Sequence, residues 1–376
     1  MTLSTHQFHL PTGHLTLQLD TPMPASLDAY LRVVARLNPK RGFLFVSHLL
    51  GKHVPTPMGR MRKGHDRLAR LVAPTVSAGT GDVLVIGLAE AATGLGYGVW
   101  RSLAGQMHAE GRTAFFLQTT RHRAMGPAWA FEEHHSHAPT QWIQGLDDPR
   151  LGHVQHLVLV DDDLSTGDTL SGLQAVVQPH LPALRTVQWA ALTDFRPDDR
   201  RDHPAHALLQ GRWDFKLTKA YPSPSGNAAN PVDPTKLHAD FGRAAPLDWE
   251  GRKRELTVAR QWLVDQPIQG RVLVVGTGEF MALPMELAER IEALAGVESV
   301  DFQATTRSPA MMPGVPLGED HYGEGIPQFI YNFDRDAYDS VIVVVETPPN
   351  SATERLGRLL NALVVGPSMA PVEPSP

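Results

Sequence analysis

The chain contains no cysteine, which excludes disulfide bonds, thiolate nucleophiles and cysteine-ligated zinc sites. It also has no run that approaches the roughly 18 consecutive apolar residues needed for a membrane-spanning helix. Its first residues, MTLSTHQFHL, lack the basic and apolar blocks of a signal peptide. These absences predict a cytoplasmic protein that has no membrane partner.

Positive charge is not in excess either. The chain has 34 Lys and Arg against 40 Asp and Glu, a net charge of -6 at pH 7. Because nucleic-acid-binding proteins usually carry a basic face, this balance disfavours general nucleic-acid binding. What is present, 42% hydrophobic and 20% charged residues, is typical of a folded globular protein. A chain of 376 residues is longer than a domain with one hydrophobic core usually is, which predicts two domains.

The first two thirds of the chain alternate between apolar runs and helical patterns. We expect a hairpin over 9–19 and helices over 27–37, 64–72 and 169–177, with strands at 42–47, 82–89, 114–118, 157–160 and 187–195. A further helix should follow the turn at 90–96 and continue through 104. Residues 124–141 show neither periodicity and are interpreted as a loop. Strands that alternate with helices in this way predict an α/β fold with a doubly wound parallel sheet.

A second, smaller α/β domain is expected in the C-terminal third. The charged stretch 196–212 precedes a Pro-, Ser-, Asn- and Gly-rich stretch at 222–234, which is the best linker candidate. A helix over 255–264, strands at 271–275, 299–304 and 340–346, and a helix over 284–294 follow. We therefore expect a first domain over 1–221, a linker over 222–250, a second domain over 251–368 and a disordered tail over 369–376.

The most informative stretch is LVLVDDDLSTGDTL at 157–170, an apolar strand that leads into acids and then a Ser-Thr-Gly-x-Thr turn. Asp161 and Asp162 follow the strand, where ligands bind in open α/β sheets, and their carboxylates suit the hydroxyls of a ribose. The turn of Ser165, Thr166, Gly167 and Thr169 offers hydroxyls and backbone N–H groups for a terminal phosphate. The alternative is an ordinary strand-to-helix turn with an Asp or Ser cap.

This order of parts resembles the signature of type I phosphoribosyltransferases. Asp161 and Asp162 fall on the acid pair of that signature, whereas Asp163 occupies a position that is usually apolar. The resemblance implies that Asp161 and Asp162 are catalytic. It also implies that the phosphoribosyl group is bound by Asp163, Leu164, Ser165, Thr166, Gly167, Asp168 and Thr169.

The turn at 90–96 lies where this family places its pyrophosphate loop. Such a loop turns backbone N–H groups toward the ligand, and Glu90, Ala91, Ala92 and Thr93 follow the strand in that position. Two arginines, Arg121 and Arg123, follow the expected strand at 114–118, and Lys52 follows the strand at 42–47. Their positive charges suit a diphosphate. The alternatives are an ordinary small-residue turn and solvated loop charges.

A His- and Glu-rich segment, FEEHHSH at 131–137, could act as a lid over the substrate. Its candidate residues are Glu132, Glu133, His135 and His137. The alternatives are a plain exposed loop and a structural zinc site, although the spacing fits no helical His-x3-His face.

Two further turns follow strands of the second domain. Gly276, Thr277, Gly278 and Glu279 form half of a dinucleotide fingerprint without its third Gly, and Thr306, Arg307 and Ser308 leave the next strand. We expect the two turns to form an anion pocket that faces the first domain and selects the nucleotide-like substrate, with little effect on the donor. An ordinary capped loop is the alternative.

Together these motifs resemble phosphoribosyltransferases that are encoded with tellurium-resistance and stress-response genes and carry a C-terminal domain named for its Thr-Arg-Ser-Pro motif, here 306–309. The resemblance implies a Mg²⁺-dependent pentosyltransferase that uses phosphoribosyl diphosphate (PRPP) or a 5-phosphoribosyl nucleotide and an unidentified base. Asp161 and Asp162 would meet Mg²⁺ through the ligand. A homodimer is left open. The alternatives are a non-catalytic nucleotide or PRPP sensor and, less favoured by the acidic balance, an RNA-binding role.

Overall fold

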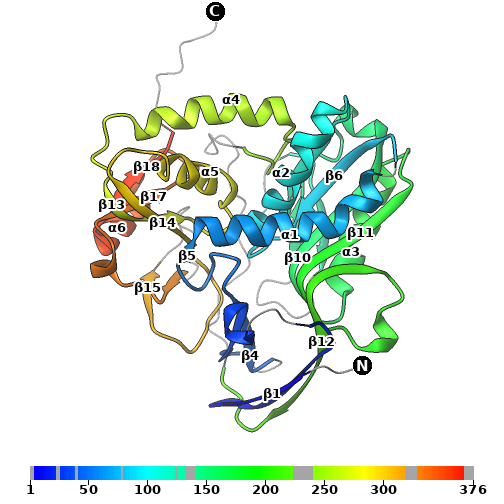
Figure 1. The fold of residues 1–376 in the computed structure, drawn as a ribbon, viewed down its shortest axis with the longest axis horizontal. Helices are drawn as coiled ribbons and strands as arrows, with labels where there is room; N and C mark the ends of the chain where they lie inside the picture. The colour runs from blue at the N-terminus through cyan, green and yellow to red at the C-terminus, as the bar shows by residue number, and fades with distance from the viewer. Residues whose placement is uncertain are drawn as a thin grey trace, which may run out of the picture.

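The computed structural model describes residues 4–22, 26–38, 41–77, 79–122, 126–132, 140–222, 240–318 and 328–367. Within them, the chain forms two main sheets, one built mainly from the first 217 residues and one mainly from the C-terminal third (Figure 1). The expected tail, 369–376, and most of the expected linker, 223–239, lie outside the described residues.

The first sheet has the order β1-β2-β12-β11-β10-β6-β7 among the described strands. The strands from β12 to β7 are parallel, and β1 and β2 add an antiparallel edge. Their bounds are β1 Ser4–Leu10, β2 Gly13–Leu19, β6 Asp82–Gly87, β7 Ala114–Gln118, β10 Val154–Leu164, β11 Thr186–Asp194 and β12 Ala205–Leu217. The central parts of β6, β7 and β10, residues 83–87, 114–117 and 157–160, are buried apolar runs, as parallel strands covered on both faces require. The predicted α/β fold with a parallel central sheet is confirmed.

The helix expected over 27–37 is wrong. A short 3-10 turn, Leu27–Ala29, is followed by strand β3, Leu31–Ala35, which pairs antiparallel with β4, Phe43–Ser47. Val33 and Val34 are β-branched and favour a strand. The ladder with β4 supplies the backbone partners that a helix would otherwise provide, so tertiary pairing decided this segment.

Two other segments form strands that the sequence patterns did not indicate. The loop expected at 124–141 contains the hairpin of β8, Trp129–Glu132, and β9, Thr140–Ile143. The charged stretch 196–212 continues into β12, whose partners are β11 and β2. Charged and polar residues alternate along β12 on its exposed side, so its hydrophobic signal is weak.

Three helices accompany the first sheet: α1 Met58–Ser77, α2 Thr93–Ala109 and α3 Asp168–Val177. α1 packs against α2, where the ring of His65 fills the space beside Gly98. His65 is 1% exposed, and neither ring nitrogen has a hydrogen-bond partner in the described part of the chain. Burial, assisted by the charge of Arg101, lowers the pKa of His65 to about 3.

We expect His65 to make the protein sensitive to mild acid. The unfolded chain binds a proton at His65 below about pH 6.5, whereas the folded chain does so only near pH 3, so stability falls as the pH drops through this window. The expected slope is up to about 1.4 kcal/mol per pH unit. Urea unfolding at pH 7.5 and 5.0 should show a smaller loss for His65→Leu than for the wild type; equal losses would contradict this role.

The second sheet has the order β18-β17-β13-β14-β5 among the described strands. Its bounds are β5 Thr56–Pro57, β13 Gly270–Gly276, β14 Val297–Ala304, β17 Ser340–Val344 and β18 Leu363–Val365, with helices α4 Trp249–Ala259, α5 Ala282–Ile291 and α6 Ser351–Leu360. A small hairpin, β15 Gly314–Gly318 and β16 Gln328–Tyr331, lies beside it. The edge strand β5 comes from the N-terminal part of the chain and pairs with β14. The second sheet therefore includes a strand from the part of the chain that builds the first sheet.

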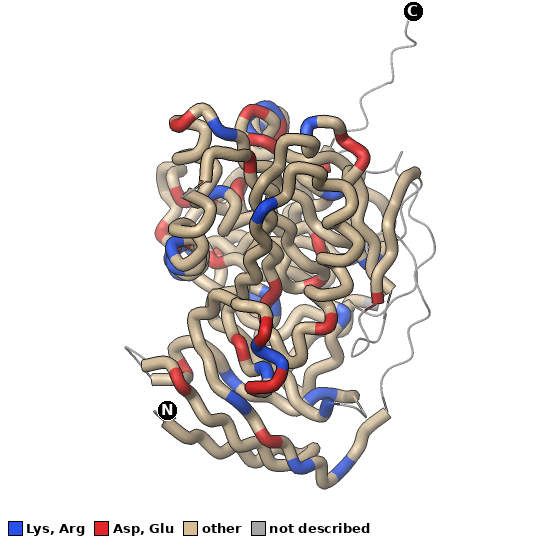
Figure 2. The backbone as a smooth tube through the Cα atoms, turned by 90° about the vertical axis from the view of Figure 1, so that its right-hand side faces the viewer, with Lys and Arg blue, Asp and Glu red and all other residues tan. Residues whose placement is uncertain are grey.

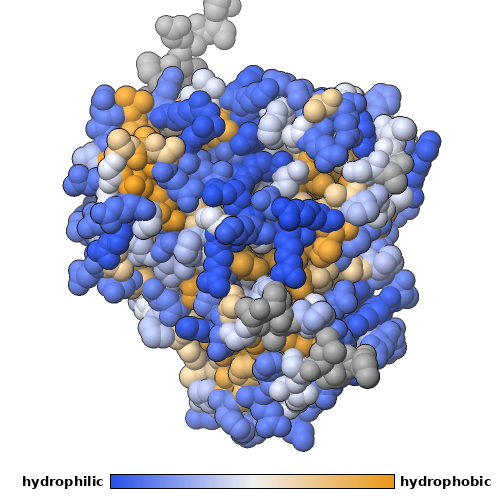
Figure 3. All heavy atoms as spheres, in the orientation of Figure 1, coloured by the Kyte–Doolittle hydropathy of each residue, from blue (hydrophilic) through white to orange (hydrophobic). Residues whose placement is uncertain are grey.

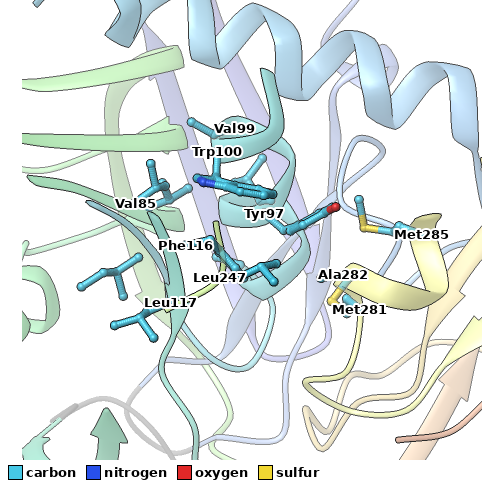
Figure 4. Close-up of a cluster of buried hydrophobic side chains, with 14 of the residues drawn as sticks. Val85, Tyr97, Val99, Trp100, Phe116, Leu117, Leu247, Met281, Ala282 and Met285 are labelled. Atoms are coloured by element: carbon cyan, nitrogen blue, oxygen red, sulfur yellow. The ribbon is translucent and has the colours of Figure 1, made fainter. Parts of the chain in front are cut away.

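A continuous hydrophobic cluster joins the two parts of the molecule. Figure 4 shows Tyr97 and Trp100 of α2 between Phe116 of β7 and the residues of α5, with the Tyr97 ring directed toward Met285. The Tyr97 hydroxyl donates a 2.6 Å hydrogen bond to Glu286 of α5. Arg252 of α4 also binds Glu286, with an Nη2 to Oε1 distance of 2.7 Å. Apolar packing and the hydrogen bond from Tyr97 to Glu286 therefore hold the second domain against α2, and Arg252 fixes the Glu286 carboxylate from within the second domain.

The surface carries charges of both signs. Lys and Arg alternate with Asp and Glu along the tube in Figure 2. Hydrophilic side chains cover most of the face seen in Figure 3, between smaller hydrophobic patches. No helix in the described ranges is long and apolar enough to span a membrane.

Candidate active site

The Ser-Thr-Gly turn connects β10 directly to α3. Gly167 caps α3 with φ 85°, a left-handed conformation that L side chains rarely adopt. A Cβ atom at Gly167 would lie 3.0 Å from the Trp189 ring. Asp168 N–H donates a 3.3 Å hydrogen bond to Thr166 Oγ1. The turn thus directs the N–H groups of the first α3 turn toward the carboxyl edge of the sheet, where an anion can be bound.

The three consecutive acids differ in their contacts. Asp161 Oδ1 accepts a 2.9 Å hydrogen bond from the N–H of Asp162, and both side chains are partly buried. Asp163 forms a 2.7 Å ion pair with Arg41 and accepts a 2.8 Å hydrogen bond from Thr193 Oγ1. The Arg41 guanidinium also lies over the Phe43 ring. The carboxylate of Asp163 therefore holds the β3–β4 hairpin against the sheet through Arg41.

The turn between β6 and α2 is held from its neighbours. Ala89 N–H donates a 2.8 Å hydrogen bond to Thr119 Oγ1, and Arg121 Nη2 donates to Ala89 O at 3.3 Å. Thr93 begins α2, and its hydroxyl donates to the backbone oxygen of Glu279 at 2.8 Å. The small residues Ala91 and Ala92 complete the turn. The structure thus brings Arg121 to this turn, as the sequence suggested.

Glu90 is the centre of a cluster of charges from both domains. Lys52 Nζ lies 2.9 Å from Glu90 Oε1 and donates a 2.6 Å hydrogen bond to Gly278 O, while its side chain is only 1% exposed. Arg307 N–H donates to Glu90 Oε1 at 3.3 Å, and Arg307 Nε lies 3.9 Å from Oε2. Burial alone would raise the pKa of Glu90, but Lys52, Arg307 and a hydrogen bond from Thr306 lower it to about 2. Glu90 is therefore ionised at neutral pH.

Glu279 anchors the second domain to the loop after β7. Its carboxylate accepts hydrogen bonds from Thr120 Oγ1 and Arg121 N, each at 2.7 Å, and lies 3.2 Å from Arg243 Nη1. Arg243 Nη2 lies 3.0 Å from Glu346, and all three charged side chains are at most 3% exposed. No sequence motif marked Arg243 or Glu346, because each gains its partner only from the tertiary fold.

The remaining candidate residues of the second domain differ in whether their polar groups have hydrogen-bond partners. The Gly278 N–H, which could face an anion, donates instead to Thr305 Oγ1 at 2.8 Å. Arg307 Nη2 lies against the ring of His122, a residue that the sequence reading did not single out. Ser308 and Thr277 have hydroxyl oxygens without a hydrogen-bond partner in the described ranges.

The expected lid falls mostly outside the described residues. Glu133, His135 and His137 are among those not described, so the lid remains a prediction. Glu132 ends β8 and accepts a 3.0 Å hydrogen bond from Thr140 Oγ1 within the hairpin. The described ranges contain no cluster of three His, Asp or Glu side chains that could hold a metal ion alone.

The carboxyl edges of the two sheets therefore meet. Turns after β6 and β7 contact turns after β13 and β14 through Lys52, Glu90, Glu279 and Arg307. The turn after β10, with Asp161, Asp162 and Gly167, belongs to the same edge of the first sheet, since β10 pairs in parallel with β6. This edge combines two carboxylates, the turn that opens helix α3 and several cations.

Residues 30–219 match the family described as phosphoribosyl transferase, and residues 246–363 match that described as TRSP domain C terminus to PRTase_2. Solved structures similar to the chain include adenine phosphoribosyltransferase from Saccharomyces cerevisiae, at 15% identity and TM-score 0.33 over 49% of this chain and 96% of that chain. Hypoxanthine-guanine phosphoribosyltransferase from Bacillus anthracis is also similar, at 14% identity and TM-score 0.26 over 45% and 80% of the two chains. None of the curated proteins compared matches the chain.

Proposed function

The chain belongs to the phosphoribosyl transferase family, and from that premise we propose that it moves a 5-phosphoribosyl group between PRPP and a nitrogen base of a nucleotide-like metabolite. In the synthetic direction a ring nitrogen bonds to ribose C1 and the bond from C1 to the diphosphate oxygen breaks. The electron pair leaves with diphosphate, and the nitrogen releases its proton. The observation that supports this most is the continuous path from Asp161 and Asp162 of β10, through Gly167, into the N-terminus of α3.

The ribose and its phosphate are assigned to this path. Asp161 and Asp162 bind the ring hydroxyls and stabilise the positive charge that develops at C1 as the bond breaks. The turn at 164–169 binds the 5-phosphate through hydroxyls and N–H groups. Asp163, whose carboxylate is occupied by Arg41 and Thr193, contributes by fixing the backbone before the turn.

The leaving diphosphate is assigned to the turn at 90–93 with Lys52 and Arg121. Arg307 belongs to the same set, because its contacts are with Glu90 in this turn and with His122 after β7. Glu90 then acts as an internal counter-ion, which keeps two buried cations paired until the ligand arrives. This assignment departs from the expectation that Arg307 serves the nucleotide-like substrate.

Magnesium fits the donor set of the proposed site. Mg²⁺ prefers oxygen ligands and binds through one or two carboxylates together with substrate phosphates. The adjacent carboxylates of Asp161 and Asp162 offer such oxygens without an all-protein cage. When bound, the ion supplies positive charge to the diphosphate. The nearby residues orient the ligand and exclude water.

Arg307→Ala should weaken the binding of inorganic diphosphate roughly 10- to 150-fold, because a hydrogen bond to a charged group contributes about 1.5 to 3 kcal/mol. Ribose 5-phosphate should bind as before, since its turn lies at α3. Isothermal titration of each ligand measures both effects. Arg271→Ala, which removes an exposed arginine of the same domain, is the matched control. Unchanged diphosphate affinity in Arg307→Ala would remove Arg307 from the site.

The proposed function itself is tested by PRPP binding and base-dependent release of diphosphate. Calorimetry with PRPP and Mg²⁺ should show one site per chain. A panel of purine and pyrimidine bases should then reveal diphosphate release with at least one of them. PRPP binding without turnover on any base would favour the sensor, and absence of PRPP binding would overturn both.

A further inference from the structure

The order of strands in the second sheet creates a switch point between β13 and β17. The chain leaves β13 through α5 to β14 on one side, whereas β17 and then α6 and β18 lie on the other side. α5 packs on the face that includes Val274, and α6 packs on the opposite face, which includes Val275. In open α/β sheets, ligands bind beyond the carboxyl ends of the two strands at such a point.

Those two strands are followed by buried hydroxyls that lack partners. Thr277 comes directly after β13 and is 1% exposed, and Thr347 follows β17 and is 4% exposed. Neither Oγ1 atom has a hydrogen-bond partner in the described part of the chain. Thr277 and Thr347 thus lie just beyond the carboxyl ends of β13 and β17, which are paired neighbours in the second sheet.

Two glutamines near the same edge of the sheet have the same deficiency. Gln303 of β14 donates through Nε2 to Tyr331 O at 2.7 Å, which leaves its buried Oε1 atom unpartnered. Gln328 of β16 lies two residues before Ile330, which packs into the α6-side core, and in the described part of the chain neither its Oε1 atom nor that of Gln303 has a hydrogen-bond partner. Unpaired buried polar groups are costly and uncommon. Four of them at or beside the carboxyl edge of the second sheet indicate a site for a ligand.

This polar group of residues adjoins the proposed diphosphate site. Gly278, next to Thr277, accepts the hydrogen bond from Lys52. Phe329, next to Gln328, pairs through its backbone with Thr306, the neighbour of Arg307. A ligand held here would therefore lie beside the turn that receives the leaving group.

We propose that Thr277, Gln303, Gln328 and Thr347, the switch-point pocket, bind the acceptor of the transfer reaction, an uncharged nucleobase-like heterocycle. This inference rests on the proposed function. The four side chains are neutral. Of the adjacent charges, Lys52 belongs to the proposed diphosphate site and Glu346 is paired with Arg243. A charged ligand would be desolvated here without a counter-ion. Ring N–H groups match the two glutamine oxygens, and ring acceptors match the two hydroxyls.

The test uses Thr277→Val and Thr347→Val in the full chain, since valine has nearly the same shape and removes only the hydroxyl. Adenine, hypoxanthine, guanine, uracil and orotate are titrated by calorimetry, each with saturating ribose 5-phosphate. We expect at least one uncharged base to bind and each variant to weaken it at least about tenfold, the effect of one hydrogen bond of about 1.4 kcal/mol. Orotate, which carries a carboxylate, should bind more weakly than that base.

Melting temperatures of the ligand-free protein separate this role from a structural one. Thr277→Val and Thr347→Val remove unpartnered hydroxyls and should leave the melting temperature unchanged or higher. The matched control is Thr305→Val, a buried threonine on the same sheet edge whose hydroxyl accepts the Gly278 N–H, and it should lower the melting temperature.

Several results would overturn the pocket while leaving the proposed function intact, provided that ribose 5-phosphate binds. They are unchanged base affinity in both variants, no binding of any uncharged base to the wild type, preference for orotate, or melting temperatures lowered as in Thr305→Val. The last result would mean that ordered water fills the space. Failure of ribose 5-phosphate to bind the wild type would instead overturn the proposed function.

Discussion

Gly167→Val should abolish the binding of 5-phosphorylated ribosides. The native φ of 85° is unfavourable for a β-branched residue, and the new Cβ atom would press on the Trp189 ring at 3.0 Å. The turn would then move, and its N–H groups would no longer converge on one phosphate. The backbone strain costs on the order of 1 to 3 kcal/mol, which a folded domain of this size can tolerate. Calorimetry with ribose 5-phosphate measures the binding.

Gly111→Val is the matched control for this substitution. Gly111 follows α2 with φ 71°, and a Cβ atom there meets no atom within 4 Å. It should therefore suffer a similar backbone strain and keep its affinity for ribose 5-phosphate. If Gly167→Val remains folded and binds ribose 5-phosphate as the wild type does, the turn is not the phosphate site.

Asp161→Asn and Asp162→Asn should each lower turnover by about 10² or more, the usual effect of removing one preorganised electrostatic group. Each substitution retains the size of the side chain and removes its negative charge. The loss should appear mainly in kcat, because the charge at C1 develops only in the transition state. Initial rates of diphosphate release, with the base identified in the panel, provide the measurement.

Asp82→Asn is a control at the opposite end of the same sheet. Asp82 begins β6, and its Oδ1 atom accepts a 2.8 Å hydrogen bond from Thr113 N–H. This variant should lose some stability and keep its turnover. The acid pair is structural if both Asp161→Asn and Asp162→Asn keep their turnover within roughly threefold of wild type. Such a change is smaller than the tenfold effect that corresponds to about 1.4 kcal/mol.

Much of the fold could be predicted because its strongest signals are local. The central strands β6, β7 and β10 are continuous apolar runs, and the Ser-Thr-Gly turn after β10 is specified by residue types within a few positions. The segment 31–35 was not predicted as a strand, because two β-branched residues are a weak local signal and the pairing with β4 decides its structure. β12 was also missed, because polar residues on its exposed side interrupt the apolar pattern of a strand.

The candidate site divides in the same way. The order of residues along the chain specified the acid pair, the Ser-Thr-Gly turn, the turn at 90–93 and the Thr-Arg-Ser loop, because each motif lies at the end of a single strand. The contacts of Lys52 with Glu90 and Gly278, and of Arg243 with Glu279 and Glu346, join residues up to 226 positions apart. Local patterns carry no information about such pairs, since burial and partner choice depend on how the two sheets pack. The sequence by itself determined which chemical groups stand at each strand end, and only the tertiary structure decided which strand ends face each other.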